Sequence, residues 1–371
     1  MKKKILFLIP NLKHGGAEKV LVNLVNNLDE QKYDITVQTL FDEGVHKDEL
    51  KPSIRYISSL KKEFRGNSHI IKRIPAKMLW NILVKEKYDI AISYLEGPTS
   101  YILSGCKDKN IKKVAWLHIE LNNPKLAALG FKNVYEAEKA YNEFDKIIAV
   151  SRNVKECFLN NINVKTPIEV LYNTNETETI KARSNELIQD SQLDENEMNV
   201  CSVAKLMKTK GYDRLLNVHK KLMDEGLKHH IYLLGIGEEQ QNLEKQMKEL
   251  GIEDSVTLLG YKDNPYQYVS KCDLYVCSSR REGFSTAVTE ALIVGTPVVS
   301  TNCSGAYELL GDNNEYGIVT ENSEDGIYEG MKKMLSNPNL LTYYKEKAKE
   351  RGSFFSRTKT VQAVEEMLDN L

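Results

Sequence analysis

The chain has 371 residues, of which 41% are hydrophobic and 28% charged, and its formal net charge is −1. This composition describes a globular protein with room for two domains and excludes a disordered chain. No apolar run is long enough to cross a membrane. The six cysteines show no paired metal-ligand spacing, which suits reduced thiols in the cytoplasm and argues against structural zinc. We therefore expect a cytoplasmic protein.

Strand and helix patterns alternate along the first half of the chain. The apolar run that starts at residue 4 ends early at Pro10, so it predicts a first buried strand at 4–9 and not a signal peptide. Alternation of this kind is typical of α/β architecture with parallel sheets. Further strands are predicted at 35–40, 90–94, 114–117, 147–150 and 168–171, with helical stretches such as 17–28 between them.

Two features of the first half follow predicted strands. Gly15 and Gly16 come just before the first helix, where they would let a ligand approach the backbone, although a plain tight turn would also use them. His118 ends the strand at 114–117. It could act on a ligand, or it could be a hydrogen-bonded core histidine.

The first half is also the basic half. Through Tyr172 there are 28 Lys and Arg against 20 Asp and Glu, a net +8, and the remainder has 23 against 32, a net −9. Segment 61–87 has eight basic residues against two acids, with apolar residues between them. Such a segment can lie on anionic lipid headgroups, or it can be a solvated helix with a buried apolar face. No nucleic-acid recognition motif accompanies it. The basic residues are Lys61, Lys62, Arg65, Lys72, Arg73, Lys77, Lys85 and Lys87.

A polar, acidic stretch separates two series of elements, and we place the interdomain linker there, at 176–198. A first domain then covers 1–175, a second covers 199–355, and a final helix at 356–371 crosses back to the first domain. The second domain has predicted strands at 200–204, 231–234, 256–259, 274–277, 298–300 and 317–319. We therefore expect two tandem doubly wound, Rossmann-like domains that face a central cleft, with ligands beyond the carboxyl ends of the strands.

Two loops of the second domain contain candidate ligand-binding residues. Lys205, Lys208 and Lys210 follow its first strand, where ammonium groups suit a diphosphate, although solvated lysines would look the same. Gly235 and Gly237 match half of a dinucleotide-binding fingerprint. The third glycine of that pattern is missing, so an NAD interpretation is weak.

The most informative stretch is 282–290, where two carboxylates lie eight residues apart around a Gly-Phe-Ser turn. Ser285 or Thr286 can cap a helix that ends near Gly295. Backbone N–H groups at the start of that helix would bind a diphosphate without a metal. Glu282 would precede the helix and Glu290 would lie about one turn inside it, so the two would serve different groups of one ligand. Solvated surface acids are the alternative.

With these features the chain resembles, over essentially its whole length, the retaining GT-B glycosyltransferases of family four, which includes capsule, exopolysaccharide and lipopolysaccharide enzymes. The matching residues are Glu282 and Glu290 for the family's E-x7-E signature, Gly15 and Gly16 for its glycine loop, Lys205 and Lys210 for its basic pair, and His118 for its strand-end histidine. Two departures are Lys205, where arginine is more common and would bind phosphate in a more fixed geometry, and Glu120, where aspartate is common.

The resemblance implies a role for each matched residue. Glu282 would hold a donor-sugar hydroxyl, Glu290 the ribose, and Lys205 and Lys210 the diphosphate. The implied catalytic residues are His118, Lys205, Lys210 and Glu282. The implied donor site also includes Gly15, Gly16, Tyr261, Lys262, Gly283, Phe284, Ser285, Thr286 and Glu290, with the base held by the loop at 260–263.

The resemblance further implies a hexosyltransferase that moves a hexose or N-acetylhexosamine from a nucleotide sugar, with UDP the expected nucleotide. The acceptor would be a glycan or lipid-linked glycan in surface polysaccharide or glycoconjugate biosynthesis. The lipid-linked acceptor, and peripheral contact with the inner membrane face, are suggested only by the basic segment 61–87. No Asp-x-Asp occurs, so we expect no metal and no other cofactor. The resemblance to the family implies transfer on the front face of the sugar. Two other classes stay open, an NAD-dependent two-domain dehydrogenase and a non-catalytic sugar-nucleotide-binding partner.

Overall fold

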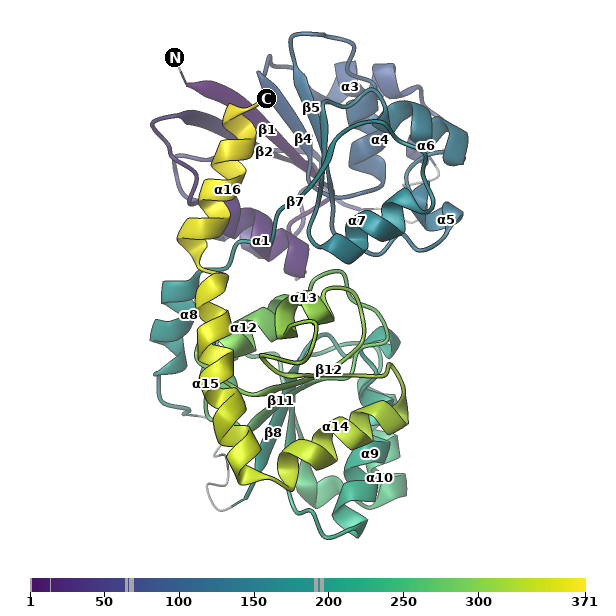
Figure 1. Ribbon diagram of the computed structural model, residues 1–371. Coiled ribbons are helices and arrows are strands. Elements are labelled where there is room, and N and C mark those ends of the chain that lie inside the picture. The colour runs from purple at the N-terminus through teal and green to yellow at the C-terminus, as the bar shows by residue number, and fades with distance from the viewer. Residues whose placement is uncertain (1, 14, 64–65, 67–69, 190–192, 194–196) are drawn as a thin grey trace. The chain divides into compact units, whose positions relative to one another are not determined.

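The computed structural model describes every residue except 1, 14, 64–65, 67–69, 190–192 and 194–196. The chain divides into two compact units, one of residues up to Asn175 together with Arg357–Leu371, and one of Glu176–Ser356. Each is built on a parallel sheet with helices on both faces (Figure 1). The predicted α/β class with two doubly wound domains is confirmed. The central cleft stays a prediction.

The sheet of unit 1 has seven strands in the order β3-β2-β1-β4-β5-β6-β7. Its strands are β1 (Lys3–Ile9), β2 (Tyr33–Phe41), β3 (Arg55–Leu60), β4 (Ile90–Ser93), β5 (Lys112–Leu117), β6 (Lys146–Ala149) and β7 (Ile168–Val170). Its helices are α1 (Gly16–Val25), α3 (Ala76–Leu83), α4 (Pro98–Ser104), α5 (Pro124–Ala127), α6 (Val134–Tyr141), α7 (Arg152–Leu159) and α16 (Arg357–Asp369). The order reverses between β1 and β4, which is where ligands bind in such sheets.

The sheet of unit 2 has six strands in the order β10-β9-β8-β11-β12-β13, and its order reverses between β8 and β11. Its strands are β8 (Asn199–Val203), β9 (His230–Leu234), β10 (Val256–Gly260), β11 (Leu274–Cys277), β12 (Val298–Thr301) and β13 (Ile318–Thr320). Its helices are α8 (Thr177–Ser184), α9 (Tyr212–Asp224), α10 (Gln240–Leu250), α11 (Tyr266–Val269), α12 (Thr286–Val294), α13 (Ala306–Leu310), α14 (Glu324–Leu335) and α15 (Pro338–Phe354).

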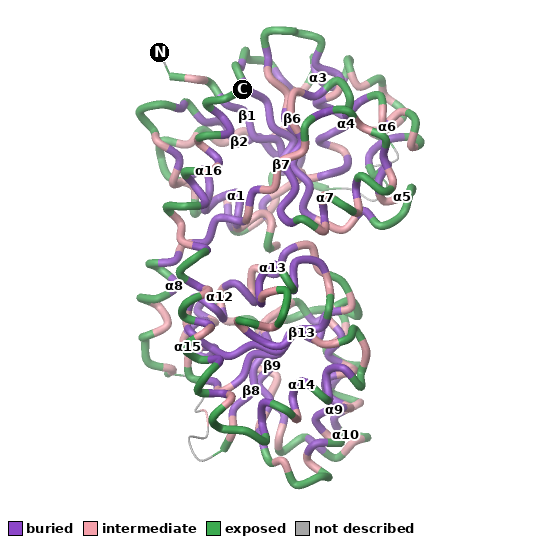
Figure 2. The backbone as a smooth tube through the Cα atoms, in the orientation of Figure 1, coloured by how far each residue is buried: buried purple, intermediate pink, exposed green. Residues whose placement is uncertain are grey.

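Burial explains why most strands could be predicted. The central strands are covered on both faces, so they are nearly continuous apolar runs, and they form the buried centre of each unit (Figure 2). The edge strand β3 was not predicted. Its side chains are only half-buried or exposed, and polar residues such as Arg55 and Ser58 hide its pattern.

The C-terminal helix α16 packs on unit 1. The backbone N–H of Asp29 donates to Glu365 Oε1 at 2.8 Å, and the hydroxyl of Tyr33 donates to Asp369 Oδ1 at 2.8 Å. Part of the predicted linker 176–198 is helix α8 of unit 2, where Ile180 is buried against Tyr266. One buried apolar residue gives too little periodicity for a helix to be predicted there.

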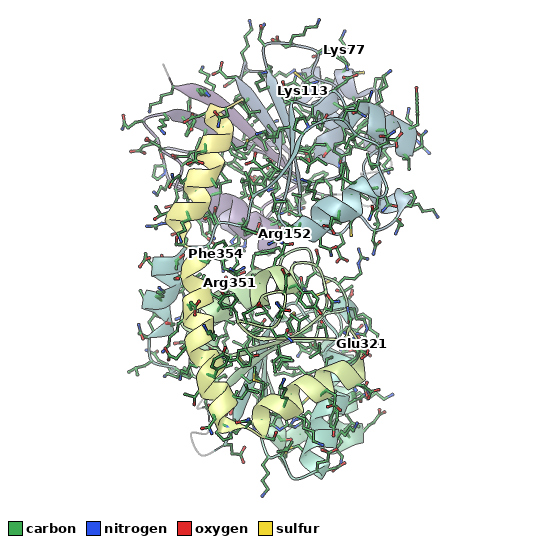
Figure 3. The ribbon with its side chains drawn as sticks, in the orientation of Figure 1. Lys77, Lys113, Arg152, Glu321, Arg351 and Phe354 are labelled. Atoms are coloured by element: carbon green, nitrogen blue, oxygen red, sulfur yellow. The ribbon has the colours of Figure 1, made fainter. Side chains whose placement is uncertain are left out.

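The basic segment 61–87 contains helix α3. Leu79 and Trp80 are buried, while Met78 and Ile82 are 54% and 49% exposed. Lys77 is also exposed on this helix (Figure 3). The predicted helix therefore has a buried apolar face, and its outer surface carries apolar as well as basic side chains. Arg65, another basic residue of the segment, lies outside the described residues.

Candidate active site

Unit 2 brings the predicted lysine loop and the predicted glutamate loop together. Strands β8 and β11 are neighbours, so the loops that follow them, 204–211 and 278–285, leave the same edge of the sheet. Lys210 Nζ lies 2.6 Å from Glu282 Oε1, although the two residues are 72 positions apart. Ser279 Oγ donates to the same carboxylate oxygen at 2.7 Å. The predicted pair is thus a preformed ion pair at the reversal point of the sheet.

This ion pair is shielded from solvent, since the side chains of Lys210 and Glu282 are only 23% and 13% exposed. Burial acts against the charged form of Lys210, but the charge of Glu282 outweighs it and raises the pKa of the ammonium group. Lys210 is therefore a cation throughout the neutral pH range. Its ammonium group can form an ion pair with an anionic ligand that displaces or joins Glu282.

The other two lysines of the loop are placed differently. Lys208 Nζ is paired with Asp213 Oδ2 at 2.9 Å. Lys205 is exposed and forms no ion pair with any residue that the structure describes. Its charge is thus available to an incoming anion without first breaking a contact.

The helix after Glu282 begins where the sequence predicted. Ser285 is the N-cap of α12, and its Oγ accepts from the backbone N–H of Val288 at 3.3 Å. Glu290 lies inside the helix and accepts from the hydroxyl of Tyr266 at 3.3 Å. Thr286 is the first helical residue, so the positive end of α12 lies directly after the Glu282 loop.

Phe284 has a packing role that the sequence did not indicate. Its ring is buried against Phe355, with centroids 5.8 Å apart, and Phe355 in turn packs against Arg351. Arg351 Cζ also lies 4.5 Å from the ring centre of Phe354, and Figure 3 labels both residues. The side chain of Phe284 therefore anchors the loop to the end of α15.

The half fingerprint at Gly235 and Gly237 has a local explanation. A Cβ at Gly235 would lie 1.9 Å from the carbonyl oxygen of Ala204, and one at Gly237 would lie 2.3 Å from that of Leu206. These glycines let their loop lie along the lysine loop. Tyr261 and Lys262 follow the edge strand β10, where Tyr261 is exposed and Lys262 Nζ lies 5.6 Å from the ring centre of Tyr268.

Unit 1 has its own cluster at the ends of β4 and β5. His118 is only 7% exposed, and its backbone N–H donates to Glu96 Oε2 at 2.8 Å. Its Nε2 atom is buried and has no hydrogen-bond partner among the described residues. The ring packs against Tyr94, with centroids 4.7 Å apart. An unpartnered buried nitrogen of this kind is available to a ligand group that reaches it.

Burial determines the charge of this cluster. It lowers the pKa of His118 to about 3, so the imidazole is neutral at physiological pH. It raises the pKa of Glu96 to about 7, although backbone N–H groups of His118 and Ile119 favour the carboxylate. His118 can accept or donate one hydrogen bond to a hydroxyl, but it cannot supply a positive charge.

The glycine loop of unit 1 lies at the end of β1, next to β4 in the sheet. Gly15 is the N-cap of α1 in an extended conformation, and Gly16 is the first helical residue. A Cβ at Gly15 would lie 1.9 Å from a carboxylate oxygen of Glu18. The Glu18 side chain is flexible and can move away, so this contact does not by itself require glycine at position 15.

Several residues of the two clusters were not predicted. Glu96 stands three residues beyond β4 and before Gly97, whose φ is +107°, and an acid followed by glycine at a strand end was the available signal. Arg280 and Asp213 are paired across 67 residues, and no spacing indicates such a pair. Ser279 was visible only as a small polar neighbour of Glu282.

The described part of the chain offers neither a metal site nor a membrane-spanning helix. No group of three or more His, Cys, Asp or Glu residues there could hold a metal ion. None of the described helices combines the length and the apolar character needed to span a membrane.

Comparison with known proteins identifies related families. A model described as "Glycosyltransferase Family 4" matches residues 14–178, and one described as "Glycosyl transferases group 1" matches residues 183–351. A Campylobacter jejuni N-acetylgalactosamine-N,N'-diacetylbacillosaminyl-diphospho-undecaprenol 4-alpha-N-acetylgalactosaminyltransferase is 34% identical over 222 residues, which cover 59% of this chain and 58% of that enzyme. An uncharacterized Haemophilus influenzae glycosyltransferase is 27% identical over 94% of each chain.

Solved structures show the same fold. Anabaena Alr3699/HepE, in complex with UDP and glucose, superposes with a TM-score of 0.81 and 22% identity over 100% of both chains. Sucrose-phosphate synthase from Thermosynechococcus elongatus superposes with a TM-score of 0.80 and 15% identity, over 100% of this chain and 99% of that one.

Proposed function

We propose a donor, an acceptor class and a mechanism from one premise, namely that this chain belongs to glycosyltransferase family four, has the GT-B fold and is a hexosyltransferase. It transfers a hexose or N-acetylhexosamine from a UDP-sugar to a glycan or lipid-linked glycan, with retention of the anomeric configuration. The observation that carries this proposal is the Lys210–Glu282 ion pair at the start of α12. It offers a cation and the positive end of a helix to a diphosphate, and a carboxylate to sugar hydroxyls.

The choice of donor and acceptor is supported by relatives. HepE was solved with UDP and glucose, and the Campylobacter relative is named for an acceptor attached to undecaprenol diphosphate. A nucleoside diphosphate leaving group and a lipid-linked acceptor are therefore the first substrates to test here. The reaction belongs to glycan biosynthesis, and surface polysaccharide or glycoconjugate assembly is the specific setting that we propose.

In the proposed mechanism the bond between the anomeric carbon and the diphosphate oxygen breaks as the acceptor hydroxyl attacks from the same face. The hydroxyl proton passes to the departing phosphate oxygen, so no protein base is required. Lys210, Lys205 and the backbone N–H groups of α12 stabilise the charge that grows on the diphosphate. Glu282 orients the sugar and Glu290 binds the ribose. Glu282 is not a nucleophile.

In this proposal unit 1 contributes His118 to the acceptor side and its glycine loop to the donor site. His118 is neutral, and its free Nε2 can form a hydrogen bond with a sugar hydroxyl. The backbone at Gly15 and Gly16 provides N–H groups near the start of α1. Neither contribution requires a metal, and the sequence contains no Asp-x-Asp motif for a metal-bridged diphosphate.

A screen of nucleotide sugars tests the central proposal. Purified protein is incubated with UDP-, GDP- and ADP-sugars, and slow hydrolysis of the donor is measured beside UDP binding by calorimetry. We expect hydrolysis of one UDP-sugar, and its loss in Lys210→Ala. Binding of UDP-sugars without turnover, even with lipid-linked acceptors, would favour a non-catalytic binding partner, and binding of NAD alone would favour a dehydrogenase.

We further propose that α3 and its basic neighbours bind the inner membrane face. The exposed side chains of Met78 and Ile82 lie among lysines and an arginine, which suits the headgroup boundary of anionic lipid. Each basic residue near such a surface contributes about 1 kcal/mol, and salt weakens the attraction.

Vesicle co-sedimentation tests this contact. Binding should rise with the anionic lipid fraction and fall in Lys72→Glu/Arg73→Glu/Lys77→Glu. The matched control, Lys109→Glu/Lys125→Glu/Lys132→Glu, makes the same charge change on exposed lysines of unit 1 outside the segment and should bind as the wild type does. Equal loss in both variants, or equal binding to neutral vesicles, would leave the segment as ordinary solvated surface.

A further inference from the structure

The loops that hold Lys210 and Glu282 are joined by a second, unpredicted ion pair. Arg280 Nη1 lies 2.7 Å from Asp213 Oδ1, and Arg280 Nη2 lies 2.8 Å from Asp213 Oδ2. This is a bidentate fork, the strongest and most directional form of an arginine–carboxylate contact. Asp213 stands in the first turn of α9, directly after the lysine loop, and Arg280 stands two residues before Glu282.

Further hydrogen bonds join the same two loops, 204–211 and 278–285. Arg280 donates from its backbone N–H to the carbonyl of Thr209 at 2.7 Å, and from Nη1 to the carbonyl of Lys208 at 2.8 Å. Ser278 Oγ donates to the carbonyl of Lys210 at 2.9 Å. These bonds reach the backbone on both sides of Lys210 and thereby fix the position from which its side chain extends.

The backbone at Gly211 shows how closely the loops approach. Its φ is +68°, and a Cβ there would lie 2.1 Å from the carbonyl oxygen of Ser278. Arg214 Nη2 donates to that same carbonyl at 2.7 Å. Because the two backbones are in contact at this point, a small change in the contacts between the loops must move Lys210 relative to Glu282.

We propose that Arg280 and Asp213 are positioning residues of the donor site, which hold the Lys210 loop against the Glu282 loop so that both side chains meet one nucleotide sugar. The inference rests on the proposed function, because it assigns the fork a task in donor transfer. Lys210 and Glu282 come from segments 72 residues apart, so only contacts between the loops can set their separation. Misplacement of a catalytic group by about 1 Å can cost about a hundredfold in rate.

Electrostatics keeps the fork closed at working pH. Burial alone would raise the pKa of Asp213, yet hydrogen bonds from Arg280 and Lys208 hold it well below its usual range. The side chains of Arg280 and Asp213 are 32% and 25% exposed, so solvent screens the pair only in part.

The chain provides matched controls. Arg281, next in sequence, is exposed and forms no ion pair with the described residues. The Lys332–Glu225 pair, at 2.9 Å, joins α14 to the end of α9 in the same unit, away from the strand ends. Arg281→Gln therefore removes the same charge without a fork, and Glu225→Gln removes an ion pair without touching the loops.

The test compares Arg280→Gln, Asp213→Asn, the double variant and both controls, with kcat and donor KM for the UDP-sugar found in the screen and with thermal unfolding. We expect each single variant to lower kcat at least about tenfold, with less than about a threefold change in KM, because the lost alignment acts mainly in the transition state. The double variant should be no slower than the slower single variant, since both remove one contact. Arg280→Lys should recover part of the loss and serves if Arg280→Gln does not fold.

The outcomes distinguish the positioning role of Arg280 and Asp213 from the proposed function on which it rests. Normal kcat in Arg280→Gln, while Lys210→Ala is inactive, overturns the positioning role and leaves the proposed function intact. A lower unfolding temperature with unchanged kcat, or losses that add in the double variant, also overturns it. Full turnover in both Lys210→Ala and Glu282→Ala overturns the proposed donor site, and the positioning role with it.

Discussion

The two units have similar topology but differ in the groups at their strand ends, which are driven toward neutral forms in unit 1 and form ion pairs in unit 2. In unit 1, Glu96 and His118 are buried, and burial drives both toward their neutral forms. In unit 2, Lys210 and Glu282 form an ion pair that raises the pKa of the Lys210 ammonium group, and Arg280 and Asp213 form a second ion pair beside it. A departing diphosphate needs fixed charge, whereas an acceptor hydroxyl needs polar groups without charge. The difference is in line with the proposed donor side in unit 2 and the proposed acceptor side in unit 1.

The largest expected effect removes the charge of unit 2. Lys210→Ala should lower transfer by about 10² to 10³, because its ammonium group stabilises charge that grows in the transition state. The measurement is steady-state transfer with the identified donor. Lys220→Ala, which removes a lysine paired with Asp224 on α9, is the control and should retain full activity. Near wild-type turnover in Lys210→Ala would remove the functional contrast between the units.

The next prediction concerns the neutral cluster of unit 1. The folded-state pKa of Glu96 is about 7, above its ordinary value of 4.5, so the folded state binds the proton more tightly than the unfolded state does. The stability contributed by the protonated Glu96 side chain is fully present below pH 4.5 and is lost as the pH rises through about 7. The pKa shift corresponds to about 3 kcal/mol in the free energy of unfolding.

Glu96→Gln does not titrate and should lack this loss. We therefore expect its free energy of unfolding, relative to the wild type, to increase by up to about 3 kcal/mol between pH 5 and pH 8. Urea unfolding at several pH values measures the difference. Glu143→Gln, which removes an exposed partner of Lys107, should show no comparable trend. Parallel pH curves for the wild type and Glu96→Gln would mean that burial does not control this carboxyl group.

Much of the fold and part of the candidate site could be predicted from the sequence, because their signals lie in short local patterns. Central strands are continuous apolar runs, and Glu282, Ser285 and Glu290 share one short segment with a cap signal. The edge strand β3 and helix α8 lack such periodicity and were missed. Glu96, Arg280 and Asp213 were missed because their roles depend on contacts between distant segments. Likewise, the packing of Phe284 on Phe355 follows from the path of α15, which no local spacing reveals.

A smaller effect tests the contribution of the start of α12, separately from that of the ion pairs of unit 2. Ser285→Ala removes the cap of α12 and should cost about 1 kcal/mol of stability. It should also weaken UDP binding slightly, since the N–H groups that we propose to bind the diphosphate lose their fixed positions. Ser323→Ala removes the cap of α14, whose Oγ accepts from the N–H of Gly326 at 3.0 Å, and should cost similar stability without changing UDP binding. Equal UDP affinity in the two variants would show that the start of α12 does not bind the diphosphate.

The smallest expected effect is none at all, when divalent metal is removed. Unit 2 has cationic groups on the proposed donor side, where the pKa of Lys210 is raised and Lys205 forms no ion pair with a described residue. These groups and the helix end can neutralise a departing diphosphate, and no Asp-x-Asp motif is present to bridge a metal to it. Transfer in excess chelator should therefore equal transfer with magnesium or manganese. If chelator abolishes transfer and manganese restores it, a metal and not the lysines of unit 2 carries the leaving-group charge.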